Sequence, residues 1–388
     1  MTENIDVVVI GGGYAGVMAA NRLTQRADVT VTLINPRPAF VERVRLHQLV
    51  GGSHTALVDL REVLAERVRL VVDSVTRIDT AERGVRLAGG GRVGYDYLIY
   101  AAGSGSAEPG VPGAAEFAYP IATFEEAQRL RPVIEAAPAT AAVTVVGAGS
   151  TGIEVAAELA EQGRRVTLAC GGTLGPYLHP RVRRAVAGRL AGLGVNVLGE
   201  AEVAEVTRDA VQLSGGRTLA SAVTVWTAGF GVPDLAACSG LSTDAMGRLL
   251  TDETLTSVDD SRIVAAGDSA APSGRPLRMS CQIASPLGAH AADTVLARIA
   301  GARPAAINLG YFGQCIALGR RAAALQISAG DDTATRFHIG GRPGAWIKER
   351  ACRRVIEELV GEAGKPGSFS WGRTDGKRGE RAALITQR

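Results

Sequence analysis

A strand, a glycine-rich loop and a helix follow one another at the start of this chain, and that succession constrains the fold more than any other feature. Within Ile5–Ile10, the four residues after Asp6 form a continuous apolar run, as expected for a parallel strand buried on both faces. The loop 11–16 reads Gly-Gly-Gly-Tyr-Ala-Gly, and Val17–Leu23 has the apolar spacing of a helix. A GxGxxG loop in this context predicts a Rossmann-type dinucleotide-binding turn.

The three glycines of this motif have separate tasks in such a turn. Gly11 permits the tight bend, Gly13 lets a diphosphate approach the backbone, and Gly16 allows close packing of the helix. The helix N-terminus then offers N–H groups and the positive end of its dipole to the phosphates. The next strand ends at Asn35, where an acidic residue usually binds the adenosine ribose; asparagine can make that hydrogen bond without the charge.

The same succession occurs again in the middle of the chain. A strand over Ala142–Val146, a loop over 147–152 (Gly-Ala-Gly-Ser-Thr-Gly), a helix over Ile153–Leu159 and a strand over Val166–Ala169 repeat the order. One glycine-rich turn can be a plain structural bend, but two in full context argue against that explanation. Cys170 follows the last of these strands, where an acid would select NADH, so either NADH or NADPH is expected here, written NAD(P)H.

Three further short strands end in small residues. Those at 97–103 and 223–229 close on Ala-Gly and mark places where the chain can pass between domains, and the one at 262–268 closes on Gly267-Asp268. A carboxylate there lies at the carboxyl end of a parallel sheet, where ligands bind. The fold class is therefore expected to be α/β, with two Rossmann-like three-layer dinucleotide-binding domains and a small C-terminal domain.

The composition excludes several other classes of protein. Hydrophobic residues make up 46% and charged residues 21%, which is typical of a globular chain, and the net charge of +3 is too small for a dedicated nucleic-acid binder. There is no secretory leader pattern at the N-terminus and no apolar run long enough to span a membrane. The five cysteines are scattered and lack metal-ligand spacing, so we expect reduced thiols, no metal and a cytoplasmic location.

Together, these motifs resemble the two-dinucleotide-binding-domain flavoproteins of the pyridine nucleotide-disulfide oxidoreductase superfamily, over roughly residues 5 to 320. The resemblance implies FAD on the first loop and NAD(P)H on the second. It implies a discontinuous FAD domain at 1–110 and 232–304, an inserted NAD(P)H domain at 111–231, and a C-terminal domain at 305–388.

Within this superfamily the chain is most similar to type II NADH dehydrogenases and to apoptosis-inducing-factor-like quinone reductases. Disulfide reductases carry a cysteine pair after the first loop, and residues 40–49 contain none. The aromatic and histidine linker of flavin monooxygenases is also missing between the two loops. In type II NADH dehydrogenases an Ala-Gln-x-Ala-x-Gln-x-Gly stretch lies along the flavin and quinone. Residues 281–288 match it at Gln282, Ala284 and Gly288, and Pro286 replaces its second glutamine.

The resemblance implies a set of site residues. Catalytic roles fall to Glu154, Gln282 and His47. The FAD site is expected to contain Gly11, Gly13, Tyr14, Ala15, Gly16, Asn35, Arg43, Val75, Ala102, Gly103, Gly267, Asp268, Gln282 and Ile283. The NAD(P)H site is expected to contain Gly147, Gly149, Ser150, Thr151, Gly152, Glu154 and Gly229. Arg43, Arg45, His47 and Gln48 are expected near the flavin or the acceptor, a solvated basic turn being the alternative.

The expected function is transfer of hydride from NAD(P)H to FAD and then of electrons to a quinone or another small acceptor. Two alternatives remain open: a redox sensor of the apoptosis-inducing-factor type, and a flavin oxidase acting on a small metabolite. The pattern of Ala345–Val360 predicts an amphipathic helix. Such a helix either covers a domain, makes a dimer contact or lies on the inner face of the membrane. The tail from Gly361, with Phe369 and Trp371 isolated in it, is expected to be loop or disordered. The chain is expected to be a monomer or a homodimer.

Overall fold

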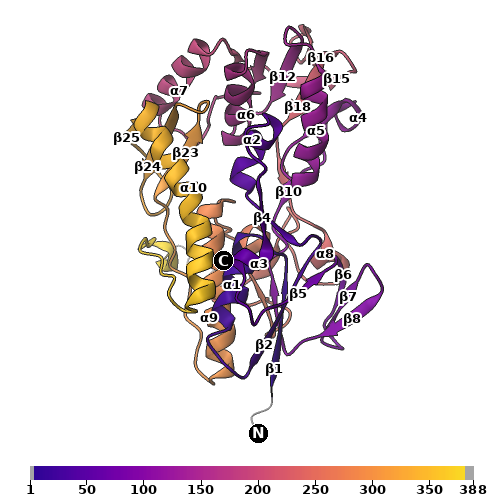
Figure 1. The fold of residues 1–388 in the computed structure, drawn as a ribbon, viewed down its shortest axis with the longest axis vertical. Helices are drawn as coiled ribbons and strands as arrows, with labels where there is room; N and C mark the ends of the chain where they lie inside the picture. The colour runs from indigo at the N-terminus through magenta and orange to yellow at the C-terminus, as the bar shows by residue number, and fades with distance from the viewer. Residues whose placement is uncertain (1–3, 381–388) are drawn as a thin grey trace.

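The first glycine loop belongs to a five-stranded parallel sheet with β1 at its centre (Figure 1). The computed structural model describes residues 4–380. The strand order is β21 (Ile263–Ala265), β9 (Tyr97–Tyr100), β1 (Ile5–Ile10), β2 (Val29–Asn35) and β5 (Arg69–Val72). The loop after β1 therefore lies between neighbours on both sides, where the strand order reverses and ligands of such sheets bind.

Both faces of this sheet are covered, which explains the continuous apolar run in β1. Val7 and Val9 pack into a core with the helices α1 and α9, whereas Val8 and Ile10 pack into a core with a three-stranded antiparallel sheet. The covering elements are α1 (Tyr14–Leu23), α9 (Cys281–Ile299), β6 (Val75–Asp79), β7 (Gly84–Leu87) and β8 (Gly91–Gly94). The helix α1 begins three residues earlier than expected, directly after Gly13.

A second unit has the same plan and carries the second loop. Its parallel sheet has the order β11 (Ala118–Pro120), β18 (Val223–Trp226), β12 (Ala142–Val146), β13 (Arg165–Ala169) and β14 (Asn196–Leu198). Its helices are α4 (Ala114–Phe117), α5 (Phe124–Ala136), α6 (Ser150–Glu161) and α7 (Pro180–Gly192), and a small sheet of β15 (Val203–Val206), β16 (Ala210–Leu213) and β17 (Thr218–Ala220) accompanies them. Two nucleotide-binding folds in one chain are thereby confirmed.

The two units are joined where the strands ending in Ala-Gly leave their sheets. There β10 (Gly105–Ser106) pairs antiparallel with β19 (Phe230–Gly231). The remaining short elements are β3 (Ala39–Val41), η1 (Arg43–Arg45), α2 (Leu46–Val50), β4 (Leu57–Asp59), α3 (Leu60–Val63), α8 (Leu235–Cys238), β20 (Leu249–Thr251), η2 (Gly267–Ser269) and β22 (Ala270–Pro272). Of these, α2 belongs to the first part of the chain but packs on α5 and α6 of the second unit.

The C-terminal part is a three-stranded antiparallel sheet followed by a long helix, the yellow segment in Figure 1. It consists of β23 (Gly313–Ala317), β24 (Ala323–Ser328), β25 (Ala334–Gly340) and α10 (Gly341–Gly364). The helix is longer than expected and contacts α1 and α3 of the first unit as well as β24. No helix among residues 4–380 combines the length and apolarity needed to cross a membrane.

The described segment after α10 is loop and turn over residues 365–377, which agrees with the loop that was expected, but its aromatic residues are packed and not isolated. Phe369 lies against the first core, and the Trp371 ring packs edge-on against Phe312 with centroids 5.0 Å apart. The Trp371 indole also donates to Gly310 O at 2.9 Å. These contacts join residues far apart in sequence, so local composition did not reveal them. Residues 381–388 of the predicted tail lie outside the described residues.

Candidate active site

The first glycine loop has the shape that a diphosphate requires. A methyl group added to Gly11 would lie 2.3 Å from Ala101 O, and one on Gly16 would lie 1.8 Å from Gly11 O. A methyl group on Gly13 would meet no heavy atom within 4 Å. The outer two glycines are therefore required by packing, whereas the middle one faces open space. The first helical bond runs from Val17 N to Gly13 O, which leaves the preceding N–H groups for an anion.

The second loop repeats this geometry at every position. A methyl group on Gly147 would lie 2.5 Å from Thr227 Oγ1, and one on Gly152 would lie 2.1 Å from Gly147 O. Gly149 again has open space, and the first helical bond of α6 runs from Ile153 N to Gly149 O. The residues present thus fit two dinucleotides, one at each glycine loop together with the helix N-terminus that follows it. We call these two sites the glycine entrances. Ser150 and Thr151, the other expected contacts, form the first turn of α6.

Asn35 lies at the end of β2 as expected, but its amide is already engaged. Its Oδ1 accepts from Gly12 N at 2.9 Å, and its Nδ2 donates to Arg37 O at 2.7 Å. The side chain thereby holds the loop against the strand end. The expected hydrogen bond to a ribose stays a prediction and would use the second amide hydrogen or lone pair.

Asp268 forms a polar cluster with residues from two other segments at the carboxyl end of the first sheet. Ser104 Oγ donates to Asp268 Oδ2 at 2.6 Å, and Arg43 Nη1 donates to Ser104 Oγ at 2.9 Å. The Arg43 guanidinium lies 3.6 Å from the Asp268 carboxylate. The structure therefore brings two predicted FAD residues together and adds Ser104, which sequence reasoning missed although it directly follows the Ala-Gly junction.

Gln282 opens α9 but uses its amide to bind the chain before β23. Its Oε1 accepts from Phe312 N at 2.9 Å, and its Nε2 donates to Gly313 O at 3.3 Å. Gly288 lies further along the same helix, where a methyl group would be 2.1 Å from Ala15 O. This stretch therefore fixes the C-terminal part and packs α9 onto α1. The catalytic role expected for Gln282 stays a prediction.

Several other predicted cofactor residues are packing positions at the edge of the two entrances. Tyr14, Ala15 and Ile283 belong to the first core, and Val75 and Ala102 pack against the core on the opposite face of the sheet. The backbone has positive φ at Gly103, Gly229 and Gly267, as it has at Gly11 and Gly147 of the two loops. Their roles toward a cofactor stay predictions.

Glu154 forms the centre of a buried ion-pair cluster that the sequence did not reveal. Its Oε1 lies 2.9 Å from Lys348 Nζ and also accepts from Ala317 N at 2.9 Å. His47 Nδ1 lies 3.7 Å from Glu154 Oε2. The lysine also donates to Cys315 O at 3.1 Å. The amphipathic pattern of Ala345–Val360 does not indicate this contact, because Lys348 is a polar residue of that helix and yet α10 docks with its side chain turned inward.

The protonation of the cluster follows from burial and from the charges in contact. Burial alone would raise the pKa of Glu154, but Lys348 and His47 lower it overall, so the carboxylate is ionised. Burial would lower the pKa of Lys348, yet the contact with Glu154 raises it well above its ordinary value. Burial lowers the pKa of His47 to about 4, and its Nε2 has no partner in the structure. At neutral pH the cluster therefore consists of an ammonium, a carboxylate and a neutral imidazole.

The segment around His47 is buried, so the alternative of a solvated basic turn was wrong for most of it. Arg45, His47 and Gln48 are each less than 5% exposed. Arg45 forms two hydrogen bonds of 3.0 Å to Glu349 on α10 and another of 3.0 Å to Glu42. The short segment η1–α2 thus contacts both α10, through Arg45, and Glu154 on α6, through His47.

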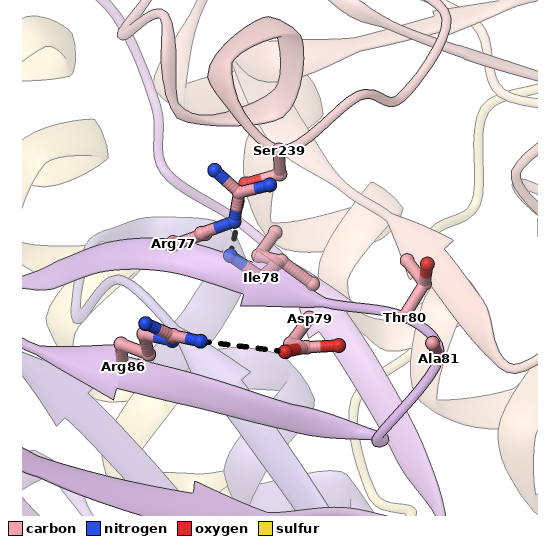
Figure 2. A pocket seen from close by; sticks show the side chains of 7 residues that line it. All are labelled: Arg77, Ile78, Asp79, Thr80, Ala81, Arg86 and Ser239. Atoms are coloured by element: carbon pink, nitrogen blue, oxygen red, sulfur yellow. Dashed lines mark hydrogen bonds and ion pairs between the residues drawn. The ribbon is translucent and has the colours of Figure 1, made fainter.

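A hollow of about 360 Å³ on the far side of the first sheet contains none of the predicted residues (Figure 2). It lies between the β6–β7 hairpin and α8 and is bordered by Arg77, Arg86, Asp79 and Ser239. Two contacts lie within it: Ile78 N donates to Ser239 Oγ at 2.9 Å, and Arg86 lies 3.8 Å from Asp79. Neither involves a predicted site residue, so the glycine loops and the Glu154 cluster are kept as the candidate active site.

Two equivalent dinucleotide entrances, with a buried charged cluster beside the second, define a two-dinucleotide flavoprotein oxidoreductase. The model of the pyridine nucleotide-disulphide oxidoreductase family matches residues 5–288. The chain belongs to that family, and FAD and NAD(P)H are its cofactors. It lacks the cysteine pair for which the disulphide members are named, since residues 40–49 contain no cysteine and the cysteines are free.

Within this family, the chain is similar to NADH dehydrogenases. The chain is 33% identical over 326 residues to an NADH dehydrogenase-like protein of Mycobacterium tuberculosis, covering 75% of this chain and 80% of the relative. It is 30% identical over 344 residues to the type II NADH:quinone oxidoreductase Ndh of the same organism, covering 77% and 74%. Its fold superposes on NDH2 from Plasmodium falciparum in complex with NADH with a TM-score of 0.77, at 16% identity, covering 95% and 99% of the two chains. The chain is therefore an enzyme of the oxidoreductase class.

Proposed function

We propose that this protein oxidises NAD(P)H through FAD and passes the electrons to a quinone. The observation that carries the proposal is the pair of glycine entrances with closely similar packing, each leaving its middle glycine open to a diphosphate. The quinone is proposed because the Mycobacterium tuberculosis relative is named a type II NADH:quinone oxidoreductase. When bound, FAD supplies the ring that accepts hydride and releases electrons singly or in pairs.

The chain's own residues divide the binding between the two units. We assign FAD to the domain formed by 1–110 and 232–304, with Gly13 at its diphosphate and the Arg43, Ser104 and Asp268 cluster holding the rest of the cofactor. We assign NAD(P)H to 111–231, with Gly149 at its diphosphate. The C-terminal part, 305–388, supplies Lys348 to the space beside the second entrance.

Besides its expected place at the NAD(P)H site, the Glu154 cluster has the groups needed to reduce a quinone. Reducing a quinone to a quinol takes two electrons and two protons, so negative charge develops on its oxygens. The Lys348 ammonium can donate a hydrogen bond to such an oxygen, and Glu154 keeps that ammonium protonated in a buried site. Neutral His47 lies against the same carboxylate and can relay a proton through its unpartnered Nε2.

The proposal is tested on purified holoenzyme in two steps. An absorbance spectrum establishes bound flavin, and anaerobic addition of NADH or NADPH should bleach it. Repeated turnover with a soluble quinone should then follow, which separates an enzyme from a redox sensor that stays reduced. A protein that takes up no flavin, or a flavin that neither dinucleotide reduces, would contradict the proposal.

We further propose that the enzyme meets its quinone at a lipid surface through its C-terminal part. The face formed by β24, β25 and the start of α10 exposes large apolar side chains, with Trp346 71% and Phe337 61% exposed. Its members are Ile327, Phe337, Ile339 and Trp346. The exposed cations Arg336 and Arg342 lie in the same segment, which suits an anionic membrane.

Vesicles test this contact directly. The holoenzyme should sediment with vesicles of phosphatidylglycerol and phosphatidylcholine, and its tryptophan emission should shift to the blue. F337S and W346S should weaken sedimentation without changing turnover with a soluble quinone. V258S, which alters an apolar residue 59% exposed elsewhere, is the matched control. Equal sedimentation of all three variants would refute the assignment of this face.

A further inference from the structure

The two nucleotide units place Asn35 and Cys170 at the same structural position. In the first unit Ile10 pairs with Ile34, and Gly11 N donates to Ile34 O at 2.9 Å. In the second unit the pairing of Val146 with Ala169 and the bond from Gly147 N to Ala169 O, also 2.9 Å, repeat this arrangement. The next residue is Asn35 in one unit and Cys170 in the other. Each side chain therefore stands at the strand end that faces the ribose of a bound dinucleotide.

The residue at this position decides how a dinucleotide-binding unit treats the 2′ position of the adenosine ribose. A carboxylate about 20 residues after the glycine loop binds the 2′-hydroxyl of NADH and repels the 2′-phosphate of NADPH. Cys170 is buried, and that burial raises the pKa of its thiol to about 11, so it carries no charge at neutral pH. Its Sγ makes only a long contact of 3.9 Å, to Leu168 O.

The turn after Cys170 is open at both of its glycines. Gly171 and Gly172 both have positive φ, at 61° and 144°, and an added methyl group on either would meet no heavy atom within 4 Å. Their N–H groups donate to Ala201 O at 3.1 Å and Gly199 O at 2.8 Å, so the turn is held in place against the neighbouring chain. The space beside the strand end is thus open and structurally fixed.

The charges around this turn favour a phosphate. The stretch 170–184 contains no aspartate or glutamate, and its four ionisable basic residues are His179, Arg181, Arg183 and Arg184. It leads into the N-terminus of the thirteen-residue helix α7, whose dipole adds to the positive potential. The register brings two acidic residues beside the turn, Glu200 and Glu202, which flank Ala201 and are both exposed.

We propose that Cys170 makes this enzyme accept NADPH about as well as NADH. This inference rests on the proposed oxidation of NAD(P)H and names the dinucleotides it uses. The thiol takes the place of the carboxylate that would exclude NADPH, and the open turn beside it accommodates the 2′-phosphate.

Binding and flavin reduction in the wild-type holoenzyme give the first test. Calorimetric titration with ADP-ribose and with 2′-phospho-ADP-ribose should give affinities within about tenfold of each other, and so should kcat/KM for NADH and NADPH in anaerobic flavin reduction. Selectivity for NADH of about a hundredfold or more would overturn the inference while leaving the proposed function intact. Failure of both dinucleotides to reduce the flavin would instead defeat the proposed function.

Substitutions at position 170 give the second test. C170D should lower kcat/KM for NADPH by about tenfold or more relative to NADH, because like charges in contact repel strongly. C170S, neutral and similar in size, should keep the wild-type ratio, and melting curves of both variants check folding. If C170D does not fold, the wild-type titration decides alone. If E200Q changes the ratio of kcat/KM for NADPH to that for NADH and C170D does not, Glu200 sets the selectivity and the inference is overturned.

Discussion

Lys348 Nζ lies 2.9 Å from Glu154 Oε1 and so connects two helices whose residues are 194 positions apart in sequence. The pair links α10 to α6, which starts at the second dinucleotide entrance. Because both side chains are largely buried, each is costly without the other. The helix α10 is therefore anchored to the second unit by this ion pair, and it also covers the first unit.

Removing the lysine should destabilise the protein and disable the acceptor side. K348M leaves Glu154 as a buried carboxylate without its cation, which should cost about 3–5 kcal/mol in the free energy of unfolding. Burial then raises the pKa of Glu154 above its unfolded value of 4.5, so the variant should lose stability as the pH rises through that range. Urea unfolding at pH 5 and pH 7 measures the free energy of unfolding of both proteins. A difference between K348M and wild type that is the same at the two pH values would contradict this prediction. Flavin reduction by NADH should persist while quinone turnover falls.

His47 should make the wild-type protein sensitive to mild acid. Its pKa is about 4 when folded and 6.5 when unfolded, so the unfolded chain binds more protons between these values. Stability contributed by the neutral imidazole is present above pH 6.5 and is lost as the pH falls, by about 2 kcal/mol between pH 6.5 and 4.5. H47Q should lack this part of the loss. H338Q, at a partly exposed histidine in β25, is the control and should lose as much stability as wild type. If H47Q loses as much stability between pH 6.5 and 4.5 as wild type does, groups other than His47 cause the loss.

The middle glycines should separate cofactor binding from folding. Gly13 and Gly149 have negative φ and open space, so alanine fits both without strain. G13A should fold but hold FAD at least about tenfold more weakly, or ~1.4 kcal/mol. G149A should keep FAD and raise the KM for NAD(P)H by a similar factor.

Flavin content and KM measure these two effects, and a melting curve confirms the fold. The matched control is G16A, whose methyl group would lie 1.8 Å from Gly11 O and should unfold the first unit. Normal flavin content in G13A would mean that the diphosphate does not pass this residue.

The contact of Arg45 with Glu349 should matter far more than surface pairs on the same helix. Arg45 is 3% exposed and also binds Glu42, so R45M should cost about 3–5 kcal/mol by stranding buried charge. R354M removes the exposed partner of Glu358 and should cost only about 0.3–0.5 kcal/mol. Chemical denaturation compares the two, and similar losses would mean that Arg45 is no more important than a solvated side chain.

Much of the architecture could be predicted because it depends on residues close together in sequence. The run Ile5–Ile10 and the loop 11–16 specify a buried strand and a tight turn before any distant contact forms. The second copy repeated the pattern and therefore strengthened the prediction. The prediction was weaker for α10, because periodicity identifies an amphipathic helix but does not say which polar residue faces a partner.

The sequence by itself determined that this chain has two dinucleotide-binding units, since each glycine loop and its flanking strand and helix form one continuous segment. Only the tertiary structure decided that His47, Glu154 and Lys348 meet, and that Trp371 packs on Phe312. These residues come from separate elements, and their distances depend on how helices and sheets pack on one another. No periodicity within a single segment encodes such a contact.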